Sequence, residues 1–390
     1  MKVAVLHSDF AGWSGAHALV YEYAKRNKDA TVFTWYYDEK DPRFSQINVV
    51  KLRNRILESK IPYRSALASF FPKFLTLPDL RGYDVLLVST SRSAEYSILN
   101  LRSKIPVGMY VHTPRRVALR GERLPPYPTL RGRLASGLSR FIGLVYLSAL
   151  ERRVWKRLDF AIFNSRLTLG RALRAGLIGE EKSKVIYPGV DLSAFSALRR
   201  SDDGYFLYVA RFAYLKRQLL LIKAFREFSR RRPGFRLILA GSVTDPKYFR
   251  LVEREKGGGV EVLPNYKEIA DLYARSTAFV HVPYMEDFGI APLEAAAAGK
   301  YVINVRPSGN YEILRDFPGV DWIDEKFREE AMAKEIERAL EKFAVNRERC
   351  VELGRSNADL LRKLDLSWDR FTMEVNSYLA SQVESWSSKG

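Results

Sequence analysis

The chain has 390 residues, of which 47% are hydrophobic and 28% charged, a balance typical of a globular protein of about two domains. Its 64 lysines and arginines outnumber 45 aspartates and glutamates, so the net charge of +19 favours anionic partners such as nucleotides, nucleic acid or an acidic membrane face. The single cysteine, Cys350, excludes an internal disulfide and fits a reducing cytoplasm.

Two apolar stretches bear on membrane insertion, and neither predicts it. Residues 2–6 are too few for the apolar region of a signal peptide and are predicted to form a first strand. Residues 141–150, between Arg140 and Glu151, fall well short of the roughly 20 residues that a membrane span needs. We therefore expect a soluble cytoplasmic protein or one attached peripherally to the inner face of the membrane.

The N-terminal stretch predicts a strand at residues 2–7, a glycine-containing turn at 12–17 and a helix from 18 to about 25. This is the opening of a βαβ unit, which places phosphate groups at a helix N-terminus. The glycine spacing is not G-x-G-x-x-G, so dinucleotide binding is not indicated. The alternative is a plain tight turn.

Further strands are predicted at residues 30–35, 85–89 and 106–111, and the last ends at His112-Thr113-Pro114. Open α/β sheets bind ligands at the carboxyl ends of their strands. His112 is therefore a candidate functional residue. The alternative is a structural histidine hydrogen-bonded to a loop carbonyl.

Residues 115–174 are rich in arginine, with apolar residues interspersed and few acids. Such a basic, partly amphipathic surface is of the kind that lies on anionic lipid. The alternative is a pair of helices that pack their apolar face into the domain while arginine stems cover its edge. The sequence leaves the two interpretations equal.

A strand at 160–163 precedes the helix cap Asn164-Ser165 and a helix at about 167–175, and the polar stretch 193–204 is the best domain boundary. A second βαβ series follows it, which predicts a parallel sheet with helices on both faces. Its predicted strands are 206–210, 236–240 and 260–263, and its helices 218–230 and 266–274. The stretch 328–381 is helical, with a capped helix beginning at Ser367.

The stretch from His281 to Glu312 predicts a strand end, a loop, a short helix with Pro292 in its first turn and Gly299 at its exit, and a strand at 301–305. Free N–H groups at a helix start attract phosphate. Two carboxylates flank that position, Glu286 in the loop and Glu294 in the first helical turn. Because both repel phosphate, their natural partners are sugar hydroxyls. The alternative is a helix-start glutamate favoured by the macrodipole and a solvated loop acid.

Arg211 ends the strand at 206–210, and Lys216 follows five residues later. Both are expected at the same sheet end as Glu286 and Glu294, where paired cations can neutralise a departing diphosphate. Either cation alone is explained equally well as a solvated side chain of a basic protein.

Together these motifs resemble the retaining glycosyltransferases of family 4, including mannosyltransferase-like members. The signature E-x7-E spans Glu286 to Glu294, and residues 209–216 resemble the donor-diphosphate motif. The stretches 12–15, 111–114 and 185–191 resemble the glycine loop, the His-Thr-Pro turn and the segment before the interdomain linker. Two departures from the family pattern stand out. The first loop lacks the usual paired glycines. After the helix glycine Gly299, Lys300-Tyr301 replaces a proline that the family often has at that position.

The resemblance implies the GT-B fold, in which two Rossmann-like, doubly wound parallel-sheet α/β domains face a central cleft. The expected domains are residues 1–195 on the acceptor side, 196–366 for the nucleotide-sugar donor, and a C-terminal helix and tail, 367–390, crossing back to the first domain. Arg211 and Lys216 would hold the diphosphate, Glu294 the ribose, and Glu286 the transferred sugar. The implied remaining contacts are made by Phe288, Gly289 and Ile290 through backbone N–H groups, by His112 to the sugar, and by Gly15 near the diphosphate.

The implied activity is transfer of a hexose, with mannose as the best guess, from a GDP- or UDP-linked donor to a glycan or lipid-linked acceptor. We expect no metal and no further cofactor, since two cations serve the diphosphate and no Asp-x-Asp motif is present. The sequence also allows two alternatives. A nucleic-acid-binding protein is disfavoured because the cations stand beside acids and no basic-aromatic motif is present. A non-catalytic relative would need the loss of Arg211, Lys216 or Glu286.

Overall fold

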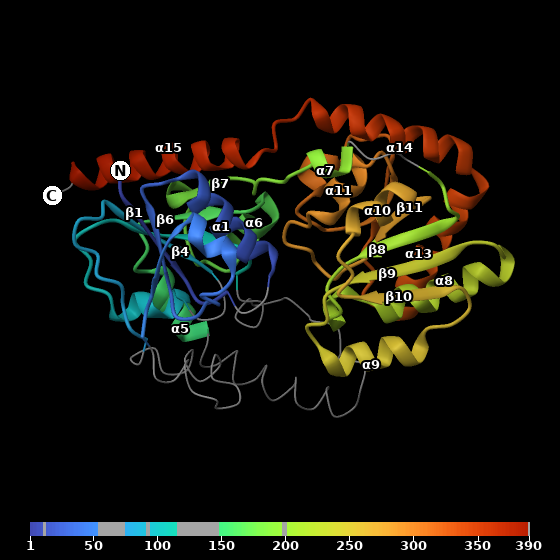
Figure 1. Cartoon of the computed structure of the whole chain (residues 1–390), viewed down its shortest axis with the longest axis horizontal. Coiled ribbons are helices and arrows are strands. Elements are labelled where there is room, and N and C mark those ends of the chain that lie inside the picture. Colours follow the sequence, from blue (N-terminus) through green and yellow to red (C-terminus); the bar gives the residue numbers. More distant parts are fainter. Residues whose placement is uncertain (11–12, 54–74, 91–93, 115–147, 197–200, 389–390) are drawn as a thin grey trace. The chain divides into compact units, whose positions relative to one another are not determined.

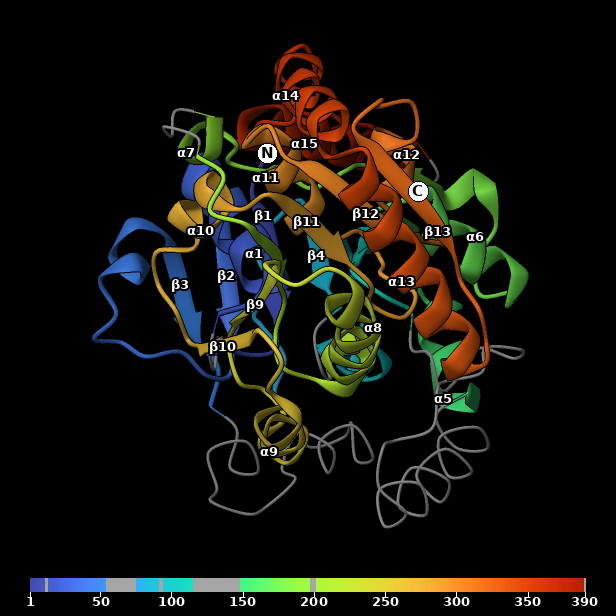
Figure 2. The same cartoon turned by 90° about the vertical axis from the view of Figure 1, so that its right-hand side faces the viewer.

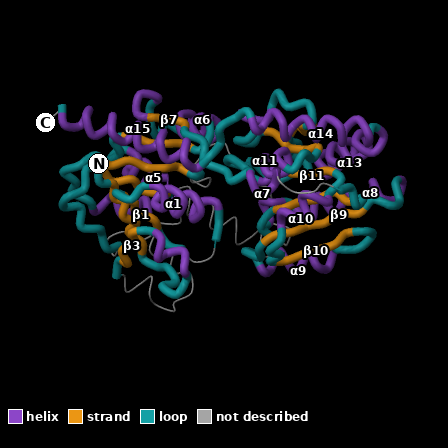
Figure 3. The backbone as a smooth tube through the Cα atoms, turned by 45° about the horizontal axis from the view of Figure 1, so that its top comes forward, coloured by secondary structure: helices purple, strands orange, loops and turns teal. Residues whose placement is uncertain are grey.

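The structure is a computed structural model that describes residues 1–10, 13–53, 75–90, 94–114, 148–196 and 201–388. The chain divides into two compact units (Figure 1). Within the described residues, unit 1 comprises the chain up to Val190 together with everything from Leu366 onward, and unit 2 runs from Asp191 to Asp365. Both units contain helices as well as strands (Figure 3).

Unit 1 is built on a parallel sheet in the order β3-β2-β1-β4-β5-β6-β7. Its strands are β1 (Val3–His7), β2 (Ala30–Thr34), β3 (Asn48–Lys51), β4 (Val85–Ser89), β5 (Val107–Val111), β6 (Phe160–Phe163) and β7 (Ser183–Val185). Its helices are α1 (Gly15–Arg26), α5 (Ser148–Trp155), α6 (Arg166–Arg174), α15 (Trp368–Ser387) and the 3₁₀ turns η1 (Pro42–Gln46), η3 (Ala94–Asn100) and η6 (Glu180–Lys182).

Both faces of the unit 1 sheet are buried, as the alternation of β1 shows. Val3 and Val5 point into one apolar cluster, and Ala4 and Leu6 into another. The first cluster takes in Phe371 and other residues of α15, which packs against α1 (Figure 1). The Ser367 hydroxyl caps α15 by accepting from the Arg370 N–H at 3.1 Å. The predictions of a capped C-terminal helix and of its return to the first domain are therefore confirmed.

Unit 2 is built on a second parallel sheet in the order β10-β9-β8-β11-β12-β13. Its strands are β8 (Tyr205–Val209), β9 (Arg236–Gly241), β10 (Val260–Pro264), β11 (Ala278–His281), β12 (Tyr301–Arg306) and β13 (Val320–Asp324). Its helices are α7 (Ser193–Ser196), η7 (Tyr214–Lys216), α8 (Gln218–Arg231), α9 (Pro246–Glu255), α10 (Ile269–Arg275), α11 (Ala291–Ala297), α12 (Tyr311–Leu314), α13 (Glu329–Val345) and α14 (Arg347–Arg362). Figure 2 shows α8 beside α13, which pack together.

The predicted pair of doubly wound parallel sheets is therefore confirmed, with differences in detail. The edge strand β3 was not predicted, because most of its side chains are exposed and it carries no apolar run. The helix α9 was also missed, although Tyr248 and Val252 bury one face of it. The expected helical stretch 328–381 is three helices, α13, α14 and α15, and α10 begins at Ile269, later than residue 266.

Candidate active site

The predicted site residues of unit 2 lie at one end of its sheet, where the strand order reverses. From β8 the chain proceeds outward through β9 and β10, whereas from β11 it proceeds in the opposite direction through β12 and β13. The neighbours β8 and β11 therefore form the topological switch point, whose carboxyl end is the usual ligand site of open α/β sheets. Arg211 and Lys216 follow β8, and Glu286 follows β11.

The loops after β8 and β11 are joined at this edge. Lys216 Nζ forms an ion pair with Glu286 Oε2, and the two side chains are only 19% and 17% exposed. One residue earlier, the Leu215 carbonyl accepts a hydrogen bond from the Tyr284 N–H at 2.8 Å. The Tyr208 hydroxyl donates to the Lys216 carbonyl at 2.6 Å. The structure thus brings together Lys216 and Glu286, which are 70 residues apart in sequence.

Arg211 lies at the same sheet end but is not part of that ion pair. Its side chain is exposed, and within the described ranges no carboxylate lies at ion-pair distance from its guanidinium. Its carbonyl accepts from Gln218 Nε2 at 3.0 Å, which ties the β8 loop to the start of α8. Its guanidinium is therefore available to an anionic ligand.

A buried polar network supports the loop that carries Glu286. Gly289 has a φ of 81°, and a Cβ there would lie 2.5 Å from Asn310 Nδ2, which donates to the Gly289 carbonyl at 3.0 Å. Asn310 Oδ1 accepts from Asn304 Nδ2 at 2.9 Å and from the Ser308 hydroxyl at 2.6 Å. His281 Nδ1 lies 2.8 Å from Asn304 Oδ1. This network fixes the conformation of the loop.

His281 is a neutral member of this network. Burial lowers the pKa of its imidazole to about 4, although nearby Glu286 acts in the opposite direction. Asn304 Oδ1 accepts the Val305 N–H at 2.9 Å and, as an amide oxygen, has no proton to donate, so His281 Nδ1 is the donor in their hydrogen bond. Its role is to orient Asn304, and through it the glycine loop.

Open backbone amides follow Glu286. Among the residues that the structure describes, no acceptor is hydrogen-bonded to the N–H of Gly289 or Ile290. The left-handed Gly289 precedes Ile290 at φ −75° and ψ −36°, and this succession of conformations turns neighbouring N–H groups toward one anion. Because α11 has only seven residues, these N–H groups contribute more to binding an anion than the dipole of α11 does.

Glu294 lies in the first turn of α11, and Pro292 occupies the same turn as predicted. Its Oε2 accepts a hydrogen bond at 2.9 Å from the hydroxyl of Tyr273, a residue of α10 that the sequence did not single out. Burial raises the pKa of the Glu294 carboxyl to about 7, while the Tyr273 hydrogen bond lowers it. The carboxyl is therefore close to half ionised near neutral pH.

Lys300, which follows the end of α11, has a structural role. Gly299 has the expected left-handed φ of 71°. Lys300 is buried, and its Nζ donates to the carbonyls of Ala274 at 2.7 Å, Ser276 at 2.8 Å and Ser201 at 3.1 Å. Lys300, the departure from the expected proline, thus caps the end of α10.

The remaining candidates, His112 and Gly15, belong to unit 1. His112 Nε2 lies 2.9 Å from the Ser89 hydroxyl, which lies 3.1 Å from His7 Nδ1. His7 and Ser89 end β1 and β4, the neighbours at the switch point of the unit 1 sheet. Burial, followed by the charge of His17, lowers the pKa of His112 to about 3, so the imidazole is neutral. The Nε2 atom of His112 is therefore hydrogen-bonded to a serine hydroxyl and not to the loop carbonyl of the alternative interpretation.

Gly15 is the first residue of α1. A Cβ built there would meet nothing within 4 Å, so packing within unit 1 does not require glycine. Of the glycine turn that sequence predicted, residue 12 lies outside the described part of the chain.

Most of the basic segment 115–174, namely residues 115–147, lies outside the described part of the chain. In the rest of it, Leu150, Val154 and Trp155 of α5 are buried in unit 1, and Arg153 and Lys156 are exposed. The apolar face of α5 therefore packs inward. Over the described residues, no helix is both long and apolar enough to span a bilayer, and no three His, Cys, Asp or Glu side chains are grouped to hold a metal ion.

Comparison with known families gives two matches in sequence. Residues 14–194 match the family described as Glycosyltransferase Family 4. Residues 191–357 match the family described as Glycosyl transferases group 1. The two matches meet close to the boundary between unit 1 and unit 2.

Among individual proteins, the GDP-Man:Man(3)GlcNAc(2)-PP-Dol alpha-1,2-mannosyltransferase of Candida glabrata is 26% identical over 244 residues. That alignment covers 55% of this chain and 46% of the relative, so the chain spans less than half the length of that relative. Sucrose-phosphate synthase from Thermosynechococcus elongatus matches in structure with a TM-score of 0.73 and 16% identity, over 98% of this chain and 99% of that one. Anabaena Alr3699/HepE, in its complex with UDP-glucose, gives a TM-score of 0.71 and 16% identity over 98% and 100%.

Proposed function

Because the chain belongs to the glycosyltransferases, joining a family 4 domain to a group 1 domain, we propose that it transfers a hexose from a nucleotide diphosphate sugar to a glycan or lipid-linked acceptor. The chain has the GT-B fold of its structural neighbours. Mannose is the leading candidate for the hexose, and retention of the anomeric configuration is the proposed stereochemical outcome.

The ion pair between Lys216 and Glu286 at the unit 2 switch point carries this proposal. It holds a cation and a carboxylate side by side, the two groups needed for a donor whose diphosphate is anionic and whose sugar is rich in hydroxyls. Exposed Arg211 lies at the same sheet end. Lys216 and Arg211 bind the diphosphate, while Glu286 accepts hydrogen bonds from the sugar hydroxyls. The open N–H groups of Gly289 and Ile290 bind sugar or phosphate oxygens.

In the proposed reaction the bond between the anomeric carbon and the diphosphate oxygen breaks, and that oxygen keeps the electron pair. A bond forms from the acceptor oxygen to the anomeric carbon, and the acceptor hydroxyl passes its proton to the departing diphosphate. The transition state resembles an oxocarbenium ion, as in glycoside hydrolysis. Lys216 and Arg211 stabilise the negative charge that develops on the leaving diphosphate, and such preorganised electrostatic stabilisation is commonly the largest catalytic contribution. We propose that these two cations take the place of a metal ion.

Two similar proteins point to two different candidate donors. The Candida glabrata relative uses GDP-mannose by its name, and the Anabaena structure holds UDP-glucose. Neither relative exceeds 26% identity. We therefore propose GDP-mannose as the first donor to test and UDP-linked hexoses as the second.

For the acceptor side, we propose that the basic segment 115–174 associates with an anionic membrane.

A donor screen tests the proposal. GDP- and UDP-linked hexoses are incubated with the protein, and release of nucleoside diphosphate is followed with and without candidate glycan acceptors. We expect one donor class to be turned over and the product anomer, assigned by NMR, to match that of the donor. Failure of every donor both to bind and to react would reject the proposed function.

A further inference from the structure

Tyr273 is a buried side chain whose hydroxyl group contacts the candidate site. It lies in α10 with 0% of its surface exposed. Its hydroxyl donates to Glu294 Oε2 at 2.9 Å and also lies 3.3 Å from the Ala291 carbonyl, another acceptor of α11. The phenol therefore links α10 to the first turn of α11, the turn that carries the glutamate assigned to the ribose.

Aromatic packing fixes the position of that hydroxyl. The Tyr273 ring meets Phe195 of α7 edge-on at 5.3 Å between ring centroids, and it lies 5.3 Å from Phe279 of β11. Two such contacts hold the ring plane independently of any ligand. The carboxylate therefore adapts to the phenol, because the packed ring cannot turn to follow the carboxylate.

The two carboxylate oxygens of Glu294 are not equivalent. Oε2 is held by Tyr273, whereas within the described residues no donor is hydrogen-bonded to Oε1. The side chain is partly exposed, so Oε1 can receive a hydrogen bond from a ligand. We propose that Tyr273 is a positioning residue that holds Glu294 Oε2 and thereby directs Oε1 to the vicinal ribose hydroxyls of the nucleotide. This inference rests on the proposed function.

The hydrogen bond from the Tyr273 hydroxyl to Glu294 Oε2 favours the ionised carboxylate, which accepts hydrogen bonds from hydroxyl groups better than the neutral carboxyl does. Burial acts in the opposite direction. The other helices packed on α11 are α7 and α14, and among the described residues neither brings a charged group that perturbs this carboxyl. Loss of the Tyr273 hydroxyl should therefore raise the pKa of Glu294 further and leave less carboxylate at neutral pH.

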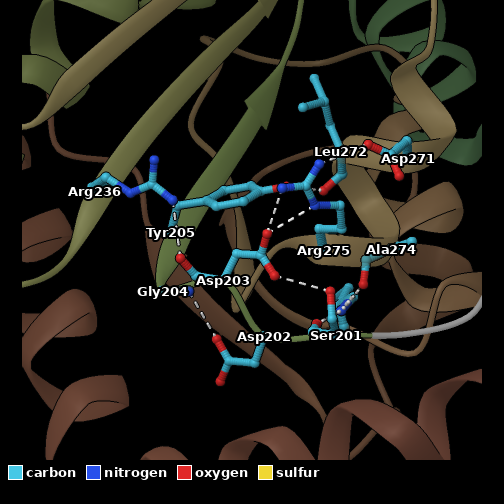
Figure 4. A network of polar contacts seen from close by, with 11 residues as sticks. Ser201, Asp202, Asp203, Gly204, Tyr205, Arg236, Asp271, Leu272, Ala274 and Arg275 are labelled. Atoms are coloured by element: carbon cyan, nitrogen blue, oxygen red, sulfur yellow. Dashed lines mark hydrogen bonds and ion pairs between the residues drawn. The ribbon is translucent and has the colours of Figure 1, made fainter.

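The chain offers a matched control in Tyr205. Its hydroxyl is also buried and donates to an acceptor of α10, the Leu272 carbonyl, at 2.8 Å (Figure 4). That hydrogen bond does not involve a carboxylate. Tyr205→Phe therefore removes a comparable buried hydroxyl beside the same helix, and Tyr273→Phe keeps the ring that packs on Phe195 and Phe279.

The first experiment needs no ligand. Carboxyl resonances of the full chain, labelled with ¹³C at glutamate side chains, are titrated by NMR, and Glu294→Gln identifies the signal of interest. We expect the wild-type midpoint near 7, an upward shift in Tyr273→Phe and no shift in Tyr205→Phe. An unchanged midpoint in Tyr273→Phe, or an equal shift in Tyr205→Phe, would overturn the inference.

The second experiment measures the affinity of UDP and GDP against their 2′,3′-dideoxy analogues at pH 7 by calorimetry. Wild-type protein should prefer the ribose form, and Tyr273→Phe should reduce that preference roughly three- to tenfold while the affinity for the dideoxy form is unchanged. Equal loss of affinity for both forms would overturn the positioning role. Binding of neither nucleotide by the wild type would instead reject the proposed function, which the titration distinguishes from failure of the Tyr273–Glu294 coupling.

Discussion

Lys216 and Glu286 neutralise each other across the switch point of unit 2, since Lys216 Nζ and Glu286 Oε2 form an ion pair in which both side chains are largely buried. On the proposed function these are the groups that receive the diphosphate and the transferred sugar. A donor therefore has to replace this pair with two new interactions, one to each partner. Ligand binding should be the event that separates cation from carboxylate.

Lys216→Ala is the most direct test of that arrangement. Removal of the ammonium group should lower the rate of sugar transfer by roughly 10²- to 10³-fold, the usual loss for one group that stabilises charge in the transition state. Donor hydrolysis and transfer assays measure it. Lys223→Ala is the control, because Lys223 lies on neighbouring α8 with its side chain 50% exposed and its nearest carboxylates at 3.9 Å.

Circular dichroism must show that Lys216→Ala remains folded, since the change removes one ion-pair partner of the largely buried Glu286. Wild-type turnover in a folded Lys216→Ala protein would remove Lys216 from the diphosphate site. A similar loss in Lys223→Ala would show that overall positive charge, and not a specific contact, supports the reaction.

Gly289→Ala should damage both stability and activity. The left-handed φ of 81° strains any residue with a side chain, and the new Cβ would meet Asn310 Nδ2 at 2.5 Å and Glu286 Cγ at 2.8 Å. Because Asn310 is held by Asn304 and Ser308, it cannot withdraw freely. We expect about 1–3 kcal/mol of destabilisation and displacement of Glu286, measured by denaturant unfolding and by transfer rate.

Gly170→Ala is the matched control for that change. It lies within α6, where a Cβ would meet only the flexible end of Arg174 at 3.3 Å. Alanine within a helix is favoured over glycine by about 0.5–1 kcal/mol, so this variant should be neutral or slightly more stable. Unchanged stability in both variants would contradict the strain assigned to Gly289.

Glu294→Gln should stabilise the ligand-free protein in a pH-dependent way. Burial raises the pKa of Glu294 from 4.5 to about 7, so the folded state releases this proton later than the unfolded state and loses stability as pH rises from 4.5 to 7. Partial exposure screens the charge, and we expect the glutamine variant to be roughly 1–3 kcal/mol more stable at pH 8. The difference should vanish as pH falls to about 4.5.

Thermal unfolding of the two proteins at pH 4.5 and pH 8 measures this difference. A stability gap that is independent of pH would show that the carboxyl is not perturbed. Nucleotide binding should weaken in the same variant even though the fold is more stable, and this combination identifies a residue retained for function.

Membrane attachment is tested by flotation with liposomes that contain anionic lipid. Each exposed lysine or arginine near such a surface contributes about 1 kcal/mol at most, and salt screens it. On the proposal, the protein floats at low salt, and the double change Arg153→Glu and Lys156→Glu, at two exposed positions of the described part of the segment, reduces the floated fraction. Flotation that is absent, or insensitive to salt, would contradict the proposal.

Much of the fold was predictable because buried parallel strands appear in the sequence as short apolar runs. The strands at 85–89 and 160–163 were predicted residue for residue. The strand β3 was not, because its exposed edge carries no such run. The helix α9 was missed because charged residues cover most of its surface and only Tyr248 and Val252 are fully buried.

The candidate site was predictable only in its charged residues. Lys216 and Glu286 stand out in sequence as charges at strand ends, and the structure joins them. Tyr273 does not stand out, since its importance depends on a contact with Glu294 made by folding α10 onto α11. Lys300 looked like a departure from the family pattern, although its three carbonyl contacts give it a structural role.

Ser89→Ala should lower the transfer rate through His112. The Ser89 hydroxyl is the hydrogen-bond partner of His112 Nε2 at 2.9 Å and of His7 Nδ1 at 3.1 Å, so it fixes how the neutral imidazole of His112 is turned. Loss of one such hydrogen bond should reduce transfer roughly three- to tenfold. Ser97→Ala is the control, because it removes another buried serine hydroxyl of unit 1, which donates to the nearby Ala94 carbonyl at 2.7 Å. Because the pKa of His112 is near 3, His112→Asn should lower the rate equally at pH 6 and pH 8. A decline in the wild-type rate near pH 6.5 that His112→Asn abolishes would show instead that the imidazole titrates during catalysis.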